Sequence, residues 1–120
     1  IDEGEEFFYQ LEGRMVLRII ENKKTKDINI NEGEIFLLPP KVPHSPQRFE
    51  NTVGLVIERK RRNGELDAFQ WYCDECHTLL YEYFFPLTNI VTQLPPIFDG
   101  FWKDDDARTC KCCSAYLEKP

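Results

Sequence analysis

The 120-residue sequence has little histidine, no long apolar run and no excess of basic residues. It contains only two histidines and one methionine. Its apolar runs, such as residues 35–38, are far too short to cross a bilayer, because a spanning helix needs about 20 apolar residues. Fifteen Lys and Arg residues stand against 21 Asp and Glu, a net charge of −6. This balance opposes nucleic-acid binding, which usually requires a basic surface, and the sequence therefore predicts neither a membrane nor a nucleic-acid partner.

Length and composition are typical of one globular domain. Apolar residues make up 42% of the chain and charged residues 30%, which excludes bulk disorder. No secretory leader, internal repeat or low-complexity segment is visible. Because the chain starts at Ile1 rather than at a methionine, directly before a strand-like run, we expect an N-terminal segment to be missing. We therefore expect a single domain over residues 1–120 that is N-terminally incomplete.

Short strand-like runs separated by turn residues recur between residues 7 and 85. These runs are rich in β-branched and aromatic residues, and many of them end near Gly, Asn or Pro. They lie at 7–11, 15–20, 27–30, 35–38, 53–58, 69–72 and 78–85. Several short strands at this spacing predict an all-β sandwich or barrel. In the last third, Pro95 and Pro96 predict the start of a short helix through Phe101, because proline suits a first helical turn.

Four of the five cysteines form two C-x-x-C pairs, Cys73 with Cys76 and Cys110 with Cys113. Each pair places two thiolates on one tight turn, which is what each half of a tetrahedral metal site needs. A disulfide framework is the alternative in a secreted chain. Since no leader is visible, we favour a metal site and expect the reducing cytoplasm as the compartment. Cys112 is the remaining cysteine and is expected to be free, with replacement of Cys113 in a shifted turn as the alternative.

Glu6 and His44 have the most informative surroundings among the polar residues. His44 follows a strand-like run and a proline turn, and Glu6 begins an aromatic strand. Because side chains alternate along a strand, Glu6, Phe8 and Gln10 share one face. A glutamate at this place either faces solvent or binds something, and the residues alone leave both open. His77 lies beside the first cysteine pair and is interpreted as structural, because four cysteines already complete a tetrahedron.

Two spaced motifs in the first 50 residues resemble the cupin pattern. The matching residues are Glu6 and Gly13 for the first motif, and Gly33, Pro39 and His44 for the second. The usual pattern has a glycine where Lys41 stands and an asparagine where Arg48 stands. These departures, together with segments 5–10, 36–40, 42–49, 71–73 and 92–96, resemble the 3-hydroxyanthranilate 3,4-dioxygenase family. The resemblance covers nearly the whole chain, and the second cysteine pair resembles the microbial and fungal form.

This resemblance implies a cupin jelly-roll β-barrel with a short helical C-terminal segment held by a metal. It implies an Fe(II)-dependent extradiol dioxygenase that opens the ring of 3-hydroxyanthranilate with O₂. The product, 2-amino-3-carboxymuconate semialdehyde, closes to quinolinate, a precursor of NAD in the kynurenine pathway. Two alternatives stay open: a metal-binding cupin with another small acidic substrate or none, and, more distantly, a zinc-ribbon interaction module.

The resemblance also assigns roles to individual residues. Glu6 and His44 are expected to bind the catalytic iron, with a further histidine just upstream of Ile1. Arg48 is expected to bind the substrate carboxylate, because its planar guanidinium can donate two parallel hydrogen bonds. Glu58 is expected to hydrogen-bond the amino and hydroxyl end of the substrate and to help move the phenolic proton. The alternatives are a surface salt bridge for Arg48 and an ion pair with the run 59–62, interpreted as a solvated loop, for Glu58.

The remaining expectations concern the pocket walls, the second metal and assembly. Phe8 and Pro46 are candidate pocket walls, with core packing as the alternative. The resemblance implies a second, rubredoxin-like site in which the cysteines of 73–76 and 110–113 form a knuckle appended to the barrel. Its metal is iron or zinc, between which sequence does not choose, and its role is structural. Family members are often dimeric, so a homodimer is a further expectation.

Overall fold

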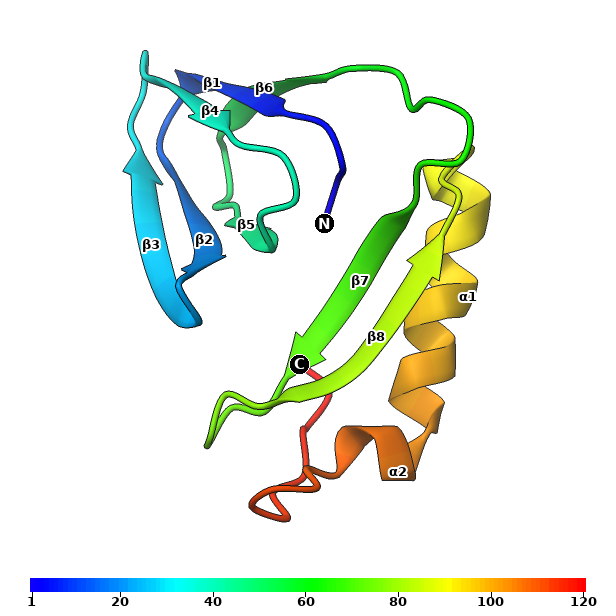
Figure 1. Ribbon diagram of the computed structural model, residues 1–120. Helices are drawn as coiled ribbons and strands as arrows, with labels where there is room; N and C mark the ends of the chain where they lie inside the picture. The colour runs from blue at the N-terminus through cyan, green and yellow to red at the C-terminus, as the bar shows by residue number, and fades with distance from the viewer. The chain divides into compact units, whose positions relative to one another are not determined.

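The computed structural model describes all residues from Ile1 to Pro120, and the chain divides into two compact units. Unit 1 covers Ile1–Glu65, and unit 2 covers Leu66–Pro120. Eight strands and only two helices make up the regular structure (Figure 1), which confirms the all-β fold class. The single cupin domain expected over residues 1–120 stays a prediction, and each unit is described by itself.

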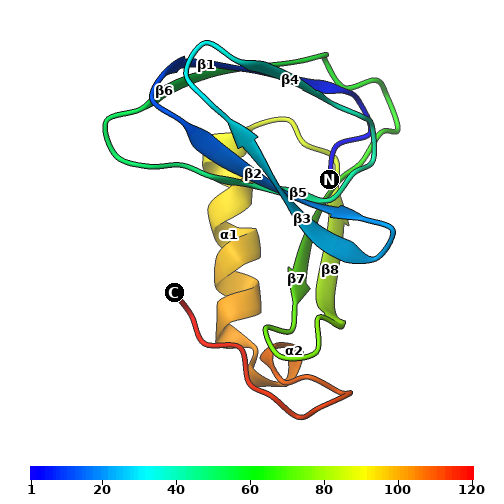
Figure 2. The same ribbon diagram turned by 90° about the vertical axis from the view of Figure 1, so that its left-hand side faces the viewer.

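Unit 1 consists of two antiparallel sheets of three strands each. In sheet A the strand order is β4–β1–β6, and in sheet B it is β3–β2–β5. The strands are β1 (Glu6–Glu12), β2 (Met15–Glu21), β3 (Lys24–Ile30), β4 (Ile35–Leu38), β5 (His44–Gln47) and β6 (Val53–Glu58). Figure 2 shows the two sheets as separate layers of this unit. This arrangement is of the cupin type, as the motifs predicted.

The core of unit 1 contains inward-facing side chains of both sheets. Burial alternates along β1 and β2, so that every second residue is buried, as half-buried strands require. The six fully buried members of this core are Phe8, Met15, Leu17, Ile19, Ile30 and Leu38. Burying each of the larger apolar side chains contributes roughly 1.5–3 kcal/mol. The core therefore fixes which face of each strand points inward, and with it the direction of Glu6 and His44.

The turn between β1 and β2 explains the glycine of the first motif. Gly13 has a φ of 70°, a left-handed conformation that side chains other than hydrogen disfavour. A Cβ atom on Gly13 would also lie 2.6 Å from Cγ2 of Thr52. Both the backbone and the space around it therefore require glycine at this position.

Unit 2 is a β-hairpin with a helix along it (Figures 1 and 2). Strands β7 (Asp67–Tyr72) and β8 (Leu79–Phe85) pair antiparallel, and α1 (Ile90–Lys103) and α2 (Asp105–Arg108) follow. Helix α1 packs against the hairpin through aromatic rings. The ring centroids of Trp71 and Phe101 are 4.3 Å apart, and those of Phe69 and Phe98 are 4.7 Å apart. Neither helix has the length and apolarity needed to span a membrane.

Helix α1 begins earlier than the prolines predicted. It starts at Ile90 because the side chain of Asn89 accepts hydrogen bonds from the backbone N–H groups of Val91 and Thr92 and so caps the first turn. Pro95 and Pro96 lie inside the helix, where each removes one backbone donor. The prediction of a start at Pro95 was wrong because the asparagine cap outweighs the positional preference of proline.

Candidate functional site

Glu6 and His44 face each other from the two sheets of unit 1. Oε2 of Glu6 lies 2.9 Å from Nε2 of His44, and the two side chains are only 9% and 12% exposed. Nδ1 of His44 lies 2.9 Å from the carbonyl oxygen of Val42. Because a carbonyl can only accept, Nδ1 carries a hydrogen and donates it to Val42. In the protonated ring Nε2–H donates to Glu6, and in the neutral ring the Nε2 lone pair is available to a metal ion. The structure therefore brings together the two residues that were predicted as iron ligands.

The two groups shift each other's protonation. Burial alone would raise the pKa of Glu6, but the hydrogen bond and the charge of His44 outweigh it, and the pKa is lowered. Burial alone would lower the pKa of His44, but its hydrogen bonds to Glu6 and Val42 raise it. The pair thus favours a carboxylate next to a positive charge. An imidazole nitrogen and a carboxylate oxygen are both ligands of non-haem Fe(II), so these residues fit the metal that the resemblance implies.

Glu58 adds a second carboxylate to the same place. In the register of sheet A, Glu58 lies directly opposite Glu6, so both side chains leave the sheet on the same face. Burial and the hydrogen bond with Glu6 raise the pKa of Glu58, although Arg61 acts in the opposite direction. Arg61 also forms an ion pair with Glu58. Glu58 therefore lies beside the Glu6–His44 pair. It also forms the ion pair with the arginine run that was the alternative interpretation.

Arg48 follows β5 and reaches toward the inner face of sheet A. A Cβ atom on Gly54 would lie 2.7 Å from Nη1 of Arg48 and 2.6 Å from Oε1 of Gln10. A side chain at position 54 would therefore displace the guanidinium group and the Gln10 amide. Gln10 is buried and shares its face of β1 with Glu6. At about 3.3 Å per residue, the backbones of residues 6 and 10 are roughly 13 Å apart, so the Glu6–His44 pair and Arg48 lie toward opposite ends of one strand face.

The two candidate wall residues have different surroundings. Phe8 belongs to the buried core of unit 1, as the alternative of core packing requires. Pro46 pairs with the buried Leu17 in sheet B and so faces the same side of that sheet, but it is exposed. Their roles as pocket walls stay predictions.

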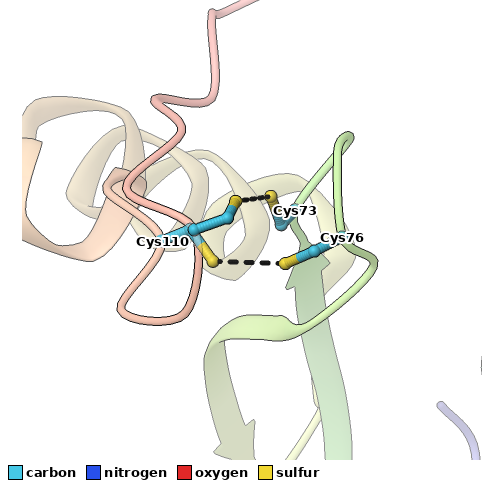
Figure 3. Close-up of side chains that lie close together, drawn as sticks. Cys73, Cys76 and Cys110 are labelled. Carbon is cyan, nitrogen blue, oxygen red and sulfur yellow. Dashed lines mark hydrogen bonds between the residues drawn. The ribbon is translucent and has the colours of Figure 1, made fainter.

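Four cysteine sulfurs gather in unit 2 (Figure 3). The Sγ atoms of Cys73, Cys76, Cys110 and Cys113 all lie within 4.8 Å of one another. The Sγ atoms of Cys73 and Cys113 are 3.6 Å apart, and those of Cys76 and Cys110 are 3.5 Å apart. A tetrahedral metal with bonds of about 2.3 Å to sulfur would have sulfurs about 3.8 Å apart. The spacing therefore fits one tetrahedral ion held by both knuckles.

The two knuckles have the same backbone hydrogen bonds. In each, the first cysteine donates to the carbonyl five residues later and accepts from the N–H four residues later. These bonds join Cys73 to Thr78 and His77 at 2.8 and 3.0 Å, and Cys110 to Ala115 and Ser114 at 2.8 and 3.0 Å. His77 and Ser114 both have a left-handed backbone, with φ of 62° and 65°. His77 thus stands at the turn position that Ser114 fills in the other knuckle, which supports its structural interpretation.

Replacement of His77 by glycine tests this interpretation. Glycine adopts the left-handed conformation without steric strain, so the backbone of the first knuckle should tolerate the change. The metal content of unit 2 should not change, and the free energy of unfolding should change by less than about 1 kcal/mol. Elemental analysis and thermal denaturation measure the two quantities, and loss of one metal equivalent would make His77 a ligand.

The four thiols cannot all ionise at neutral pH without a cation. Hydrogen bonds to the hydroxyl and backbone of Thr78 lower the pKa of Cys76 to about 6. The backbone N–H of Ala115 acts in the same direction on Cys113, but the neighbouring cysteine side chains and burial raise the pKa of Cys113 to about 12. A divalent metal would supply the positive charge that four adjacent thiolates need. The donor set therefore fits a metal ion, whose identity is a separate question.

Two residues next to Glu58, Asp2 and Arg61, were not predicted from the sequence. Arg61 belongs to the run 59–62 that was interpreted as a solvated loop, yet its side chain is only 19% exposed. Asp2 belongs to an acidic segment and is only 6% exposed. Charge runs usually indicate solvated segments, and no signal in the sequence separates these two residues from their neighbours.

The fold and the Glu6–His44 pair define the class: a cupin-type β protein whose inner face carries a buried carboxylate–imidazole pair. Comparison with known proteins identifies the family within this class. The family model described as 3-hydroxyanthranilic acid dioxygenase matches residues 1–102. The chain therefore belongs to the 3-hydroxyanthranilic acid dioxygenase family, as its motifs predicted.

Bacterial relatives are similar to the chain over most of its length. The 3-hydroxyanthranilate 3,4-dioxygenase of Xanthomonas campestris pv. campestris is 56% identical over 112 residues, which are 93% of this chain and 64% of the relative. The enzymes of the same name from Shewanella woodyi and a Jannaschia species are 54% and 52% identical over 113 residues, 93% of this chain and 60% and 63% of theirs. The chain thus spans less than two thirds of the length of these relatives.

Proposed function

We propose that the protein is an Fe(II)-dependent extradiol dioxygenase that opens the ring of 3-hydroxyanthranilate with O₂. The observation that carries this proposal is the buried contact between Glu6 and His44, at 2.9 Å, in a chain of this family. The product would be 2-amino-3-carboxymuconate semialdehyde, which leads to quinolinate and NAD. A cupin that acts on another small acid is the alternative that the assay below distinguishes.

Glu6 and His44 would hold the catalytic iron, together with the further histidine that the family resemblance implies. When bound, the iron supplies electron transfer between the substrate and O₂, whose direct reaction is spin-forbidden. The chain contributes the alignment of the ligands. The carbonyl of Val42 fixes the tautomer and orientation of His44, and the burial of both side chains keeps competing water away.

Arg48 and Glu58 would hold the two polar ends of the substrate. The guanidinium group of Arg48 would bind the ring carboxylate, at the far end of the β1 face from Glu6. The carboxylate of Glu58, opposite Glu6 in the register, would accept hydrogen bonds from the amino and hydroxyl groups. Because the pKa of Glu58 is raised, its carboxyl group holds a proton near neutrality more readily than an exposed glutamate does. Glu58 is therefore the proposed group for transfer of the phenolic proton.

Replacement of Arg48 by alanine should weaken substrate binding more than turnover. Because Arg48 contacts a carboxylate remote from the reacting bond, its loss should raise KM by about tenfold or more and change kcat much less. Arg18→Ala is the matched control, since Arg18 pairs with Asp27 on an exposed hairpin. Steady-state oxygen uptake gives both constants, and an unchanged KM for Arg48→Ala would place Arg48 in a surface role.

The four-cysteine site would hold iron or zinc and act structurally. All four ligand positions are filled by sulfur, so no position would be open to substrate. The site would tie the segment after α2 to the end of the β7–β8 hairpin. We also propose a cytoplasmic location, because a reducing compartment keeps the cysteines of a thiolate site from forming disulfides.

A homodimer is the proposed assembly. The outer face of sheet A is apolar and exposed, with Ile35, Leu37, Leu55 and Ile57 between 45% and 63% exposed. Contiguous apolar patches of more than a few hundred Å² are uncommon on monomers. Sedimentation should therefore give twice the mass of the chain, and Leu55→Glu should give a monomer. A monomeric wild-type protein would exclude this assembly.

Oxygen uptake tests the proposed reaction. The longest chain that the gene encodes is loaded anaerobically with Fe(II), its iron content is measured, and 3-hydroxyanthranilate is added. Uptake of one O₂ per substrate consumed, absent without iron, is the expected result. No uptake by protein with bound iron would exclude this substrate, and a panel of other small aromatic and aliphatic acids would then test the alternative.

A further inference from the structure

Arg61 lies between two carboxylates near the Glu6–His44 pair. Its Nη1 donates a hydrogen bond to Oε1 of Glu58. Its Nη2 lies 3.4 Å from Oδ2 of Asp2. The Arg61 side chain is mostly buried, at 19% exposure. The planar guanidinium group thus contacts two acidic residues, one near the start and one near the end of the unit 1 sequence.

Asp2, Arg61 and Glu58 form a bridge, in which Asp2 is held in place by the backbone. Its Oδ1 accepts a hydrogen bond from the N–H of Gly4 at 2.9 Å, and its backbone carbonyl accepts from the N–H of Lys41 at 2.8 Å. Oδ2 is buried, has no hydrogen-bond partner, and is left with the charge of Arg61. A buried carboxylate requires a compensating cation. Asp2 therefore holds Arg61 in place.

Glu58 is the end of the bridge that needs support. Its side chain is 34% exposed, and its carboxylate faces that of Glu6, since Asp2, Glu6 and Glu58 each have an oxygen within 4.8 Å of the others. When both carboxylates are ionised, like charges at this distance repel each other, and Glu58 would then turn toward solvent if nothing held it. The ion pair with Arg61 opposes this movement.

We propose that Asp2 and Arg61 are positioning residues that hold the Glu58 carboxylate at the catalytic site. The inference rests on the proposed function, in which Glu58 contacts the substrate. Arginine suits the role because its rigid fork has donors directed at two carboxylates at once, whereas lysine is a flexible point charge. Neither Asp2 nor Arg61 needs to touch the substrate for this role.

A kinetic double-mutant cycle on the iron-loaded protein tests the inference. Arg61→Gln should lower kcat by about tenfold, and Glu58→Gln by at least as much. The double variant should be no slower than Glu58→Gln alone, because Arg61 acts only through Glu58. Arg61→Lys should recover part of the loss, and Asp2→Asn should lower kcat in the same direction. Arg59→Gln is the matched control, because Arg59 pairs with Glu65 through two 2.7 Å bonds and should keep the wild-type rate.

The possible outcomes separate this inference from the proposed function. Losses that multiply in the double variant, or an Arg61→Gln rate equal to that of Arg59→Gln, would overturn the positioning role. If the wild-type protein with bound iron shows no turnover, the proposed function fails. The same double-mutant cycle is then measured by the Tm of thermal unfolding. Non-additive shifts in Tm for Arg61→Gln and Glu58→Gln would uphold the bridge, and additive shifts would overturn it. Arg61→Lys replaces Arg61→Gln if the latter does not fold.

Discussion

Replacement of His44 by alanine is expected to abolish oxygen uptake with 3-hydroxyanthranilate. The change removes Nε2, one of the two donor atoms that meet at 2.9 Å between the sheets. Loss of a whole catalytic group lowers kcat by about 10³-fold or more. The change also leaves the buried Glu6 without its partner, so burial should raise the pKa of Glu6 in the variant. Oxygen uptake, with iron measured in the same sample, is the readout.

His77→Ala is the control for this prediction. His77 is the other histidine of the chain and stands in a cysteine knuckle of unit 2. It should keep the wild-type rate and the wild-type content of catalytic iron. A His44→Ala protein that binds iron and turns over at the wild-type rate would remove His44 from the site. Loss of turnover in both variants would indicate a general effect on folding.

Replacement of Cys110 by serine is expected to cause the largest loss of stability. Cys110 is buried and contributes one of the four sulfurs. A serine hydroxyl is a poor ligand for zinc or ferrous ion in a thiolate site, so the variant should lose one metal equivalent per chain. Structural zinc contributes on the order of 10 kcal/mol in small domains, so Tm should fall by roughly 10 °C or more. Calorimetry and elemental analysis measure both effects.

Cys112→Ser is the matched control, because it makes the same chemical change at a cysteine outside the four-sulfur cluster. It should change neither the metal content nor Tm. Part of unit 2 should survive in Cys110→Ser, since Arg108 donates to the carbonyls of Trp102 and Leu117 and packs against the ring of Tyr116. Some turnover should therefore remain. Complete loss of turnover in folded protein that keeps its catalytic iron would contradict a purely structural role.

The sequence predicted the strands best where apolar runs end at turn residues. The observed bounds of β4 and β6 equal the predicted ones. The segment His44–Gln47 was not among the predicted strand runs, and Pro46 within it cannot donate a ladder hydrogen bond. The structure shows why proline is tolerated there: β5 is the edge strand of sheet B.

The site was predictable to the extent that motifs specify it. Glu6 and His44 were found from their spacing within the cupin pattern, and the structure brings them together. Asp2 and Arg61 were not found, because their burial depends on how distant segments meet and because each stands among residues of like charge. Local composition describes the average environment of such a run, whereas the role of one member is set by its tertiary contacts.

The placement of the two proposed iron ligands on different sheets has a mechanical consequence. Glu6 belongs to the central strand of sheet A, and His44 belongs to an edge strand of sheet B. An ion bound to both residues would therefore link the two sheets across the interior of unit 1. It would restrain β5, which is otherwise paired with a neighbouring strand along one side only. Backbone amides of β5 should exchange with solvent more slowly as Fe(II) is added, because a ligand that binds the closed arrangement lowers the population of the open one.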